Sequence, residues 1–192
     1  MMRADVKALV ISLVLLLFSP VVVFAQTPEA SHMVLATPSA TVQLSDYVLP
    51  YPGLLPDNPL YPLKTARDRI VGFLISDPLK KASFDLLQAD KRLQAGVYLI
   101  QTEGKSKEQL AEQTISKGQN YLSESVTKLQ EAKTQGRDVK DMARTISNAS
   151  QKHEEVLTDL SMKVSAQEKP PFMTLLERIH LIRSQVAHFT KK

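Results

Sequence analysis

The stretch "VYLIQTEGKSKEQLA" (Val97 to Ala111) decides the fold, because it joins two long helical patterns through a very short break. Apolar residues recur every three or four positions over 79–100, and again over 111–132. Gly104 stands where a glycine typically ends a helix. So short a link forces the chain to reverse, and we expect the two helices to be antiparallel neighbours.

The same pattern continues in both directions and predicts an all-α fold. We expect helices at about 62–75, 78–103, 107–135, 138–165 and 171–190, with short links between the last four. A helix of about 27 residues is about 40 Å long, so the three central helices match in length. The prediction is an up-and-down antiparallel helical bundle, with a slight left-handed coiled coil where the apolar spacing is nearer 3.5 than 3.6.

A proline-rich collar, "LPYPGLLPDNPLYPLK" (Leu49 to Lys64), stands before the first helix. Its five prolines exclude a helix and a central strand. One interpretation is a rigid strap over 47–61 that packs across the bundle; the other is a proline-rich ligand for an aromatic groove. The strap is favoured because its Leu and Tyr side chains call for burial, and we expect Leu60 and Tyr61 to be buried.

This collar and the segment after it resemble a bacterial family, domain-of-unknown-function family 5667. The resemblance covers roughly 49–95 and is carried by Pro59, Leu60, Tyr61, Pro62, Leu63, Lys64, Arg67, Asp77 and Pro78. Members of that family commonly follow a signal peptide, and some relatives belong to membrane-bound anti-sigma proteins. The resemblance implies a helical domain outside the cytoplasm and implies no reaction.

The first 25 residues have the organisation of a secretory signal peptide. Arg3 and Lys7 precede an uncharged apolar run at 8–18, and small residues that signal peptidase accepts end at Ala25. Continued to Ala25, the apolar stretch approaches the roughly 20 residues of a membrane-spanning helix, so a retained anchor is the alternative. Because the chain has no cysteine, we expect neither a lipoprotein anchor nor disulfides.

Residues 26–46 are rich in Thr, Ser, Ala and Pro without a helical period, which predicts a flexible linker before a single domain at 47–192. After removal of residues 1–25 the chain carries 22 basic and 19 acidic residues, a net charge of +3. This balance is too mild to indicate a nucleic-acid partner, which usually requires a clustered basic stripe.

Few residues have the arrangement that catalysis or metal binding requires. One Glu-x-x-His pair, Glu177 and His180, is present, but a di-metal bundle needs two such pairs facing inward, and Glu177 is predicted to face solvent. The sequence has no nucleophilic cysteine, glycine-framed serine or phosphate loop, so we expect no enzyme, cofactor or metal. His153 falls in an apolar stripe and is either a pH-sensitive switch or a core histidine with a partner.

The C-terminal segment has a basic side formed by Arg178, Arg183, Lys191 and Lys192. Beside a strongly apolar face, these residues fit contact with anionic lipid or a cell-wall polymer. The alternative is the solvated face of a helix that closes the bundle, and this is favoured because the helix is needed to complete the core.

The sequence therefore favours an exported, non-enzymatic helical domain, structural or interacting, in the bacterial cell envelope. Its location would be secreted, periplasmic or on the cell surface, and membrane-anchored if the leader is kept. The expected partner is an envelope protein, anionic lipid or cell-wall polymer. The alternative function is an extracytoplasmic sensory or regulatory domain linked to anti-sigma-type signalling.

The signal peptide leads to a first prediction. The mature protein should begin at Gln26, because signal peptidase cleaves after small residues such as Ala25. Intact mass spectrometry of the protein recovered from outside the cytoplasm measures this directly. Recovery of a membrane-bound species that still contains residues 1–25 would contradict cleavage and support the anchor.

Overall fold

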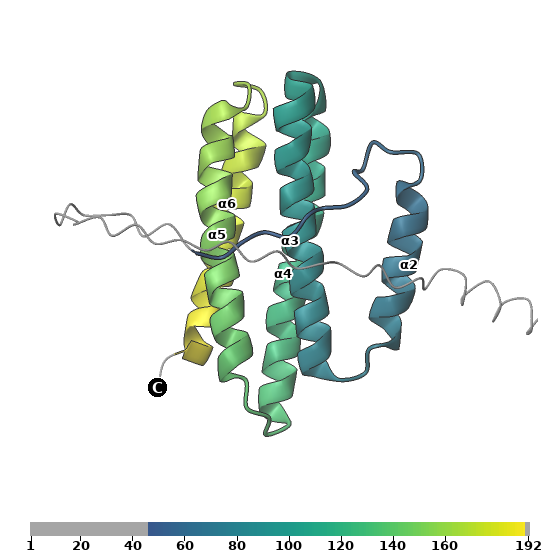
Figure 1. The fold of residues 1–192 in the computed structure, drawn as a ribbon. Coiled ribbons are helices and arrows are strands. Elements are labelled where there is room, and N and C mark those ends of the chain that lie inside the picture. The colour runs from purple at the N-terminus through teal and green to yellow at the C-terminus, as the bar shows by residue number, and fades with distance from the viewer. Residues whose placement is uncertain (1–45, 191–192) are drawn as a thin grey trace, which may run out of the picture. The chain divides into compact units, whose positions relative to one another are not determined.

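The computed structural model describes residues 46–190, and no strand occurs in that range. Its helices are α2 (Tyr61–Leu74), α3 (Pro78–Glu103), the 3-10 turn η1 (Gly104–Lys107), α4 (Glu108–Thr134), α5 (Lys140–Lys163) and α6 (Lys169–Thr190) (Figure 1). The predicted all-α class is confirmed. The predicted signal peptide, and the predicted linker up to residue 45, lie outside the described residues.

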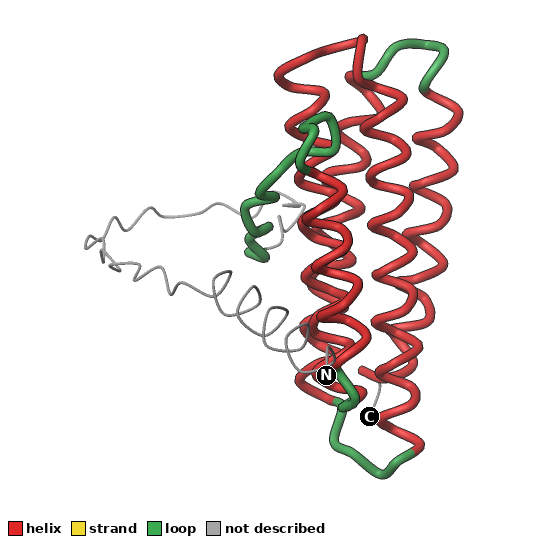
Figure 2. Tube along the Cα trace, turned by 90° about the vertical axis from the view of Figure 1, so that its right-hand side faces the viewer, coloured by secondary structure: helices red, strands yellow, loops and turns green. Residues whose placement is uncertain are grey.

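The four long helices α3 to α6 form an up-and-down bundle. Figure 1 and Figure 2 show them side by side, with neighbours in sequence running in opposite directions. α3 packs chiefly against α4 and α5 against α6, while contacts between α4 and α6 and between α3 and α5 join the two hairpins. The short link through η1 therefore makes the antiparallel pair that the Gly104 break predicts.

One continuous apolar core fills the space between these helices. Its largest fully buried apolar side chains are Leu93, Leu99, Ile115, Leu122, Leu129, Ile146, Leu157, Leu160, Phe172 and Ile179. They come from all four long helices at spacings of three and four, so each helix turns one stripe inward.

Two glycines let α3 and α4 approach each other closely. A Cβ atom on Gly96 would lie 2.5 Å from Cγ1 of Ile115, which is closer than real Cβ contacts. A Cβ atom on Gly118, in the facing helix, would lie 3.0 Å from Cβ of Arg92 and 3.1 Å from the carbonyl oxygen of Ala89. Each glycine lowers helix propensity by about 1 kcal/mol relative to alanine, and the close packing offsets this cost.

The ends of α3 follow the capping rules. Asp77 accepts a hydrogen bond from the backbone N–H of Lys80 at 3.0 Å, with Pro78 directly after it at the first helical position. At the other end Gly104 has φ of 59°, a left-handed value that favours glycine.

Two helix starts differ by two residues from the predicted positions. α5 begins at Lys140, two residues after the predicted start, and Asp138 accepts a hydrogen bond from the N–H of Lys140 at 3.0 Å. α6 begins at Lys169, two residues before the predicted start, because the two prolines at 170–171 fit a first helical turn, where N–H groups have no partner within the helix.

The strap crosses the bundle, but the side chain of Leu60 does not hold it there by packing against the helices. The segment before α2 runs in front of α5 and α3 (Figure 1). Pro52 is buried, whereas Tyr51 is 74% and Leu60 55% exposed, and Tyr61 is only partly buried. The prediction that Leu60 is buried is therefore wrong. Leu60 occupies the N-cap position of α2, where its side chain is exposed.

α2 is turned opposite to the expectation from its apolar stripe. Its buried residues are Asp68 and Gly72. This helix has apolar residues at spacings of three and four, as the other helices do, but they are exposed, at Leu63, Ala66, Ile70 and Phe73. Gly72 explains part of this orientation, because a Cβ there would lie 3.0 Å from the Phe84 ring of α3, so the glycine side of α2 can pack against that ring.

Among the described residues no helix has the length and apolar character to cross a membrane.

The close approach of α3 and α4 leads to a second prediction. Gly96→Ala should destabilise the protein by about 1–3 kcal/mol, because the added methyl group must displace Ile115 in a packed core. The matched control Gln113→Ala alters an exposed position on the facing helix and should stay within about 0.5 kcal/mol. Urea unfolding measures both. Equal midpoints for Gly96→Ala and the native protein would show that Ile115 can move aside without loss of stability, which would contradict the prediction.

Candidate functional site

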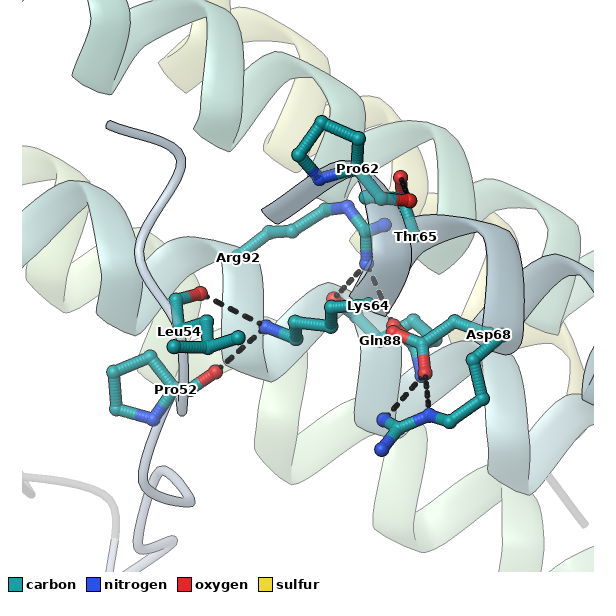
Figure 3. Close-up of polar contacts among 9 residues, drawn as sticks. Pro52, Leu54, Pro62, Lys64, Thr65, Asp68, Gln88 and Arg92 are labelled. Atoms are coloured by element: carbon teal, nitrogen blue, oxygen red, sulfur yellow. Dashed lines mark hydrogen bonds and ion pairs between the residues drawn. The ribbon is translucent and has the colours of Figure 1, made fainter. Parts of the chain in front are cut away.

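Lys64, the last residue of the "PLYPLK" run, holds the strap to α2. Its Nζ donates hydrogen bonds to the carbonyl oxygens of Pro52 at 2.8 Å and Leu54 at 3.2 Å (Figure 3). The same ammonium group lies 5.3 Å from the centre of the Tyr61 ring. Burial lowers the pKa of Lys64 below its usual range, and nearby Asp68 opposes that effect. The lysine acts as a clamp on the backbone of the collar.

The inward side of α2 is polar and faces a buried arginine of α3. Arg92 is 8% exposed and donates to the side-chain oxygen of Gln88 at 2.8 Å (Figure 3). Its guanidinium carbon lies 4.3 Å from the centre of the Tyr121 ring of α4. Burial raises the pKa of Tyr61 above its usual range, and the positive charge of Arg92 partly offsets this rise. The interface between α2 and the bundle is therefore built from polar and aromatic groups.

Asp68 completes this interface from α2. It is 5% exposed and accepts two hydrogen bonds from Arg67, from Nε at 3.1 Å and Nη2 at 2.7 Å (Figure 3). The side chain of Arg67 remains 64% exposed. Arg67, another residue of the family resemblance, thus neutralises the buried carboxylate from the solvent side.

A second polar cluster joins three distant parts of the chain, and we call it the Asp90 cluster (Tyr47, Asp90, His153). Asp90 is 2% exposed and accepts from the hydroxyl of Tyr47 at 2.6 Å. Its other oxygen lies 2.8 Å from Nε2 of His153, which is 1% exposed. Burial and the neighbouring Asp90 raise the pKa of Tyr47 far above its usual range, so the phenol stays protonated and donates. The cluster ties the start of the strap to α3 and α5.

His153 is a core histidine with a partner, as one of its two interpretations expected. The sequence showed no sign that this partner would be Asp90 or that Tyr47 would join them. Asp90 and His153 are 63 residues apart in the chain, and Tyr47 belongs to the strap.

Two further buried carboxylates are used within the fold. Asp85 is fully buried and pairs with Lys81 at 2.5 Å, and burial raises its pKa above the usual range despite that partner. Glu108, at the start of α4, accepts from the backbone N–H of Ser165 at 3.0 Å and from its hydroxyl at 2.5 Å. The two bonds between Ser165 and Glu108 hold the link between α5 and α6 against the start of α4.

The predicted basic side of the last helix is partly engaged by the bundle. Arg178 donates to the side chain of Asn120, and Arg183 pairs with Glu154, which also lies 3.6 Å from Nδ1 of His180. The two terminal lysines, 191 and 192, lie outside the described residues. Glu177 is exposed, as predicted.

Across residues 46–190 no group of His, Cys, Asp and Glu side chains has the arrangement of a metal site. An open depression beside the Asp90 cluster is lined by the strap and by α3 and α5, including Tyr47, Val97, Lys152 and Asp159. Another feature that the fold does not use is the outward face of α2.

The family profile described as "Domain of unknown function (DUF5667)" matches residues 53–167. Because the match spans more than half of the chain, this protein belongs to the DUF5667 family, which confirms the family that the sequence resembles. No curated protein and no solved structure matches the chain.

The Asp90 cluster leads to a third prediction. His153→Leu should destabilise the protein by about 3–5 kcal/mol, because removing one partner of a buried pair leaves the other charge uncompensated. The matched control His180→Leu removes a histidine that is 59% exposed and should stay within about 0.5 kcal/mol. Thermal or urea unfolding compares the two. A His153→Leu protein as stable as the control would mean that Asp90 does not depend on this bond.

Proposed function

We propose that this member of the DUF5667 family is an exported, non-enzymatic helical module of the bacterial cell envelope that acts by binding another surface. The leader at 1–25 supports export, because its charge, apolar run and small residues before Gln26 are typical of secretory signals. The family itself carries no assigned reaction.

The buried polar side chains support a structural role for the domain, because they bind other parts of the same chain. Lys64 clamps backbone carbonyls, Asp90 joins three segments, and Glu108 fixes a link between helices. Groups used in this way have their hydrogen-bonding capacity satisfied by the protein itself, which suits a rigid scaffold.

The observation that carries the proposal is the outward face of α2. Its exposed large apolar residues are Leu60 at 55%, Leu63 at 69%, Ile70 at 61%, Val71 at 37%, Phe73 at 87% and Leu74 at 69%. Contiguous apolar surface of this kind typically marks a site of contact with a partner or a membrane. We call these six residues the α2 patch.

A fourth prediction tests this function in cells. The full chain with a C-terminal tag should be found outside the cytoplasm and held in the envelope fraction. Leu63→Ser/Phe73→Ser should be exported equally well but released from that fraction by mild washing, because the α2 patch loses two of its largest side chains. Met162→Ser/Leu181→Ser is the matched control, since these residues are 70% and 64% exposed on other helices.

Two outcomes would contradict the proposal. A chain that stays in the cytoplasm would exclude an envelope role, and equal retention of both variants would show that the α2 patch is not the binding surface. A sensory role in anti-sigma-type signalling remains the second candidate, favoured by the bond that ties the strap to α3 through Asp90. In that case, loss of the protein should change sigma-dependent transcription.

A further inference from the structure

We infer that the α2 patch docks on an anionic membrane surface, with α2 lying along the headgroup boundary. This inference rests on the proposed function and names the partner of the same surface. It commits to lipid because of three features of α2: the side that is apolar, the sign of its exposed charge, and its size.

The apolar side of α2 is set apart from the rest of the surface. Phe73 is 87% exposed, while Asp68, on the opposite side of the helix, is 5% exposed. Figure 1 shows α2 at the edge of the bundle beside α3, so its outer side faces away from every other helix. A helix that keeps its polar side on the protein and its apolar side in water has the arrangement of an interfacial helix, which buries that side in the headgroup region.

The exposed charge of α2 is positive. Lys64, Arg67 and Arg69 stand against one acid, Asp68, a net charge of +2 for the helix. The acid is buried and bound by Arg67, whose side chain is 64% exposed, and Arg69 is also exposed. Exposed arginines beside an apolar face attract anionic headgroups and can keep their charged ends in the wet layer.

The acids at the two ends of α2 do not reverse this sign. Asp57, in the strap, lies 3.5 Å from Lys107, and Asp77, after the helix, lies 3.1 Å from Arg137. Each carboxylate is therefore offset by a cation of the bundle, and the outward arginines determine the local charge.

A second copy of the chain fits this surface less well. In a symmetric dimer the same patch faces itself, so Arg67, at the middle of α2, would approach its own counterpart, and such like charges cost several kcal/mol. One side of a helix about 21 Å long and about 10 Å wide covers about 200 Å². A stable protein interface needs about 800 Å² on each partner. A lipid surface imposes neither condition.

The sequence before the domain supports the same partner. Residues 8–25 have the composition of a signal peptide or membrane anchor, and about twenty residues separate them from the strap. In the alternative in which residues 8–25 are retained as an anchor, a linker of that length would span about 25 Å on average and would keep the domain close to a membrane.

The test uses a single fluorescent probe in the mature chain from Gln26, which has no cysteine of its own and lacks the apolar run at 8–18 that could itself enter a vesicle. Ala66→Cys places an environment-sensitive dye on the outward side of α2 without removing a large apolar residue, and Thr158→Cys places it on an exposed position of α5. With vesicles of equal parts phosphatidylglycerol and phosphatidylcholine, the dye at 66 should shift to the blue and the dye at 158 should not. Vesicles of phosphatidylcholine alone should give a much weaker response at 66.

Two variants, each made in the labelled Ala66→Cys chain, then test charge and apolar contact separately. Arg69→Gln should raise the lipid concentration for half-maximal response roughly fivefold, the contribution of one basic residue near an anionic surface. The control Lys105→Gln removes one exposed cation in η1 and should change that lipid concentration little. Leu63→Ser/Phe73→Ser should raise the lipid concentration for half-maximal response at least about tenfold, because apolar area is lost from the interface. Its control is Met162→Ser/Leu181→Ser.

Several results would overturn the inference. These are equal responses at 66 and 158, equal responses to anionic and neutral vesicles, or a shift at 66 that needs no lipid and rises with protein concentration. The last result would identify a second copy as the partner and would leave the proposed binding function of the α2 patch standing. A protein found in the cytoplasm would instead remove the proposed function, whatever the vesicles show.

Discussion

The fold depends on the close contact between α3 and α4. Gly96 and Gly118 lie on facing helices, and each leaves room for the partner, Ile115 in one case and the backbone of α3 in the other. This contact fixes the hairpin on which the other elements pack: α5 and α6 add to it across the apolar core, and α2 and the strap add to its outer side. Buried Arg92 belongs to the same contact, because its stem lies against Gly118 and its guanidinium over Tyr121.

Arg92 also explains why α2 turns its polar side inward. A buried guanidinium requires polar or aromatic neighbours, and α2 meets this part of α3 with Tyr61, Lys64 and Asp68. The apolar stripe of α2 is then left on the outside, because a single helix cannot present both sides to the same neighbour. The α2 patch is therefore exposed because the polar side of α2 is the side that packs against Arg92. The apolar core between the four long helices is complete without the apolar side of α2.

Most of the bundle was predictable from the sequence, because its long helices have regular apolar stripes and are separated by short breaks such as the one at Gly104. The orientation of α2 was not, since an amphipathic pattern shows that a helix has an apolar side and cannot show what that side meets. The same limit applies to Leu60, where the need for burial was inferred from residue type alone.

The Asp90 cluster could not be predicted for another reason. Its bonds join residues 43 and 63 positions apart, and a periodic pattern carries no information about such pairs. For the last helix the sequence left contact with anionic lipid as one interpretation and favoured the other, a helix that closes the bundle. In the structure Arg183 of that helix is bound by Glu154, and α2 is the helix with exposed basic residues beside an exposed apolar side.

The path of the strap has a mechanical consequence. A domain that is pulled by its N-terminal end, as any tethered protein is when its surroundings move, carries the load first at the earliest fixed side chain. Here that side chain is Tyr47, and its bond to Asp90 transfers tension directly to the middle of α3. Further along the strap Leu49 packs against the core, and Lys64 holds the carbonyl oxygens of Pro52 and Leu54. These attachments hold only the part of the chain that precedes α3, so we expect them to break one after another under force while the four-helix bundle stays intact.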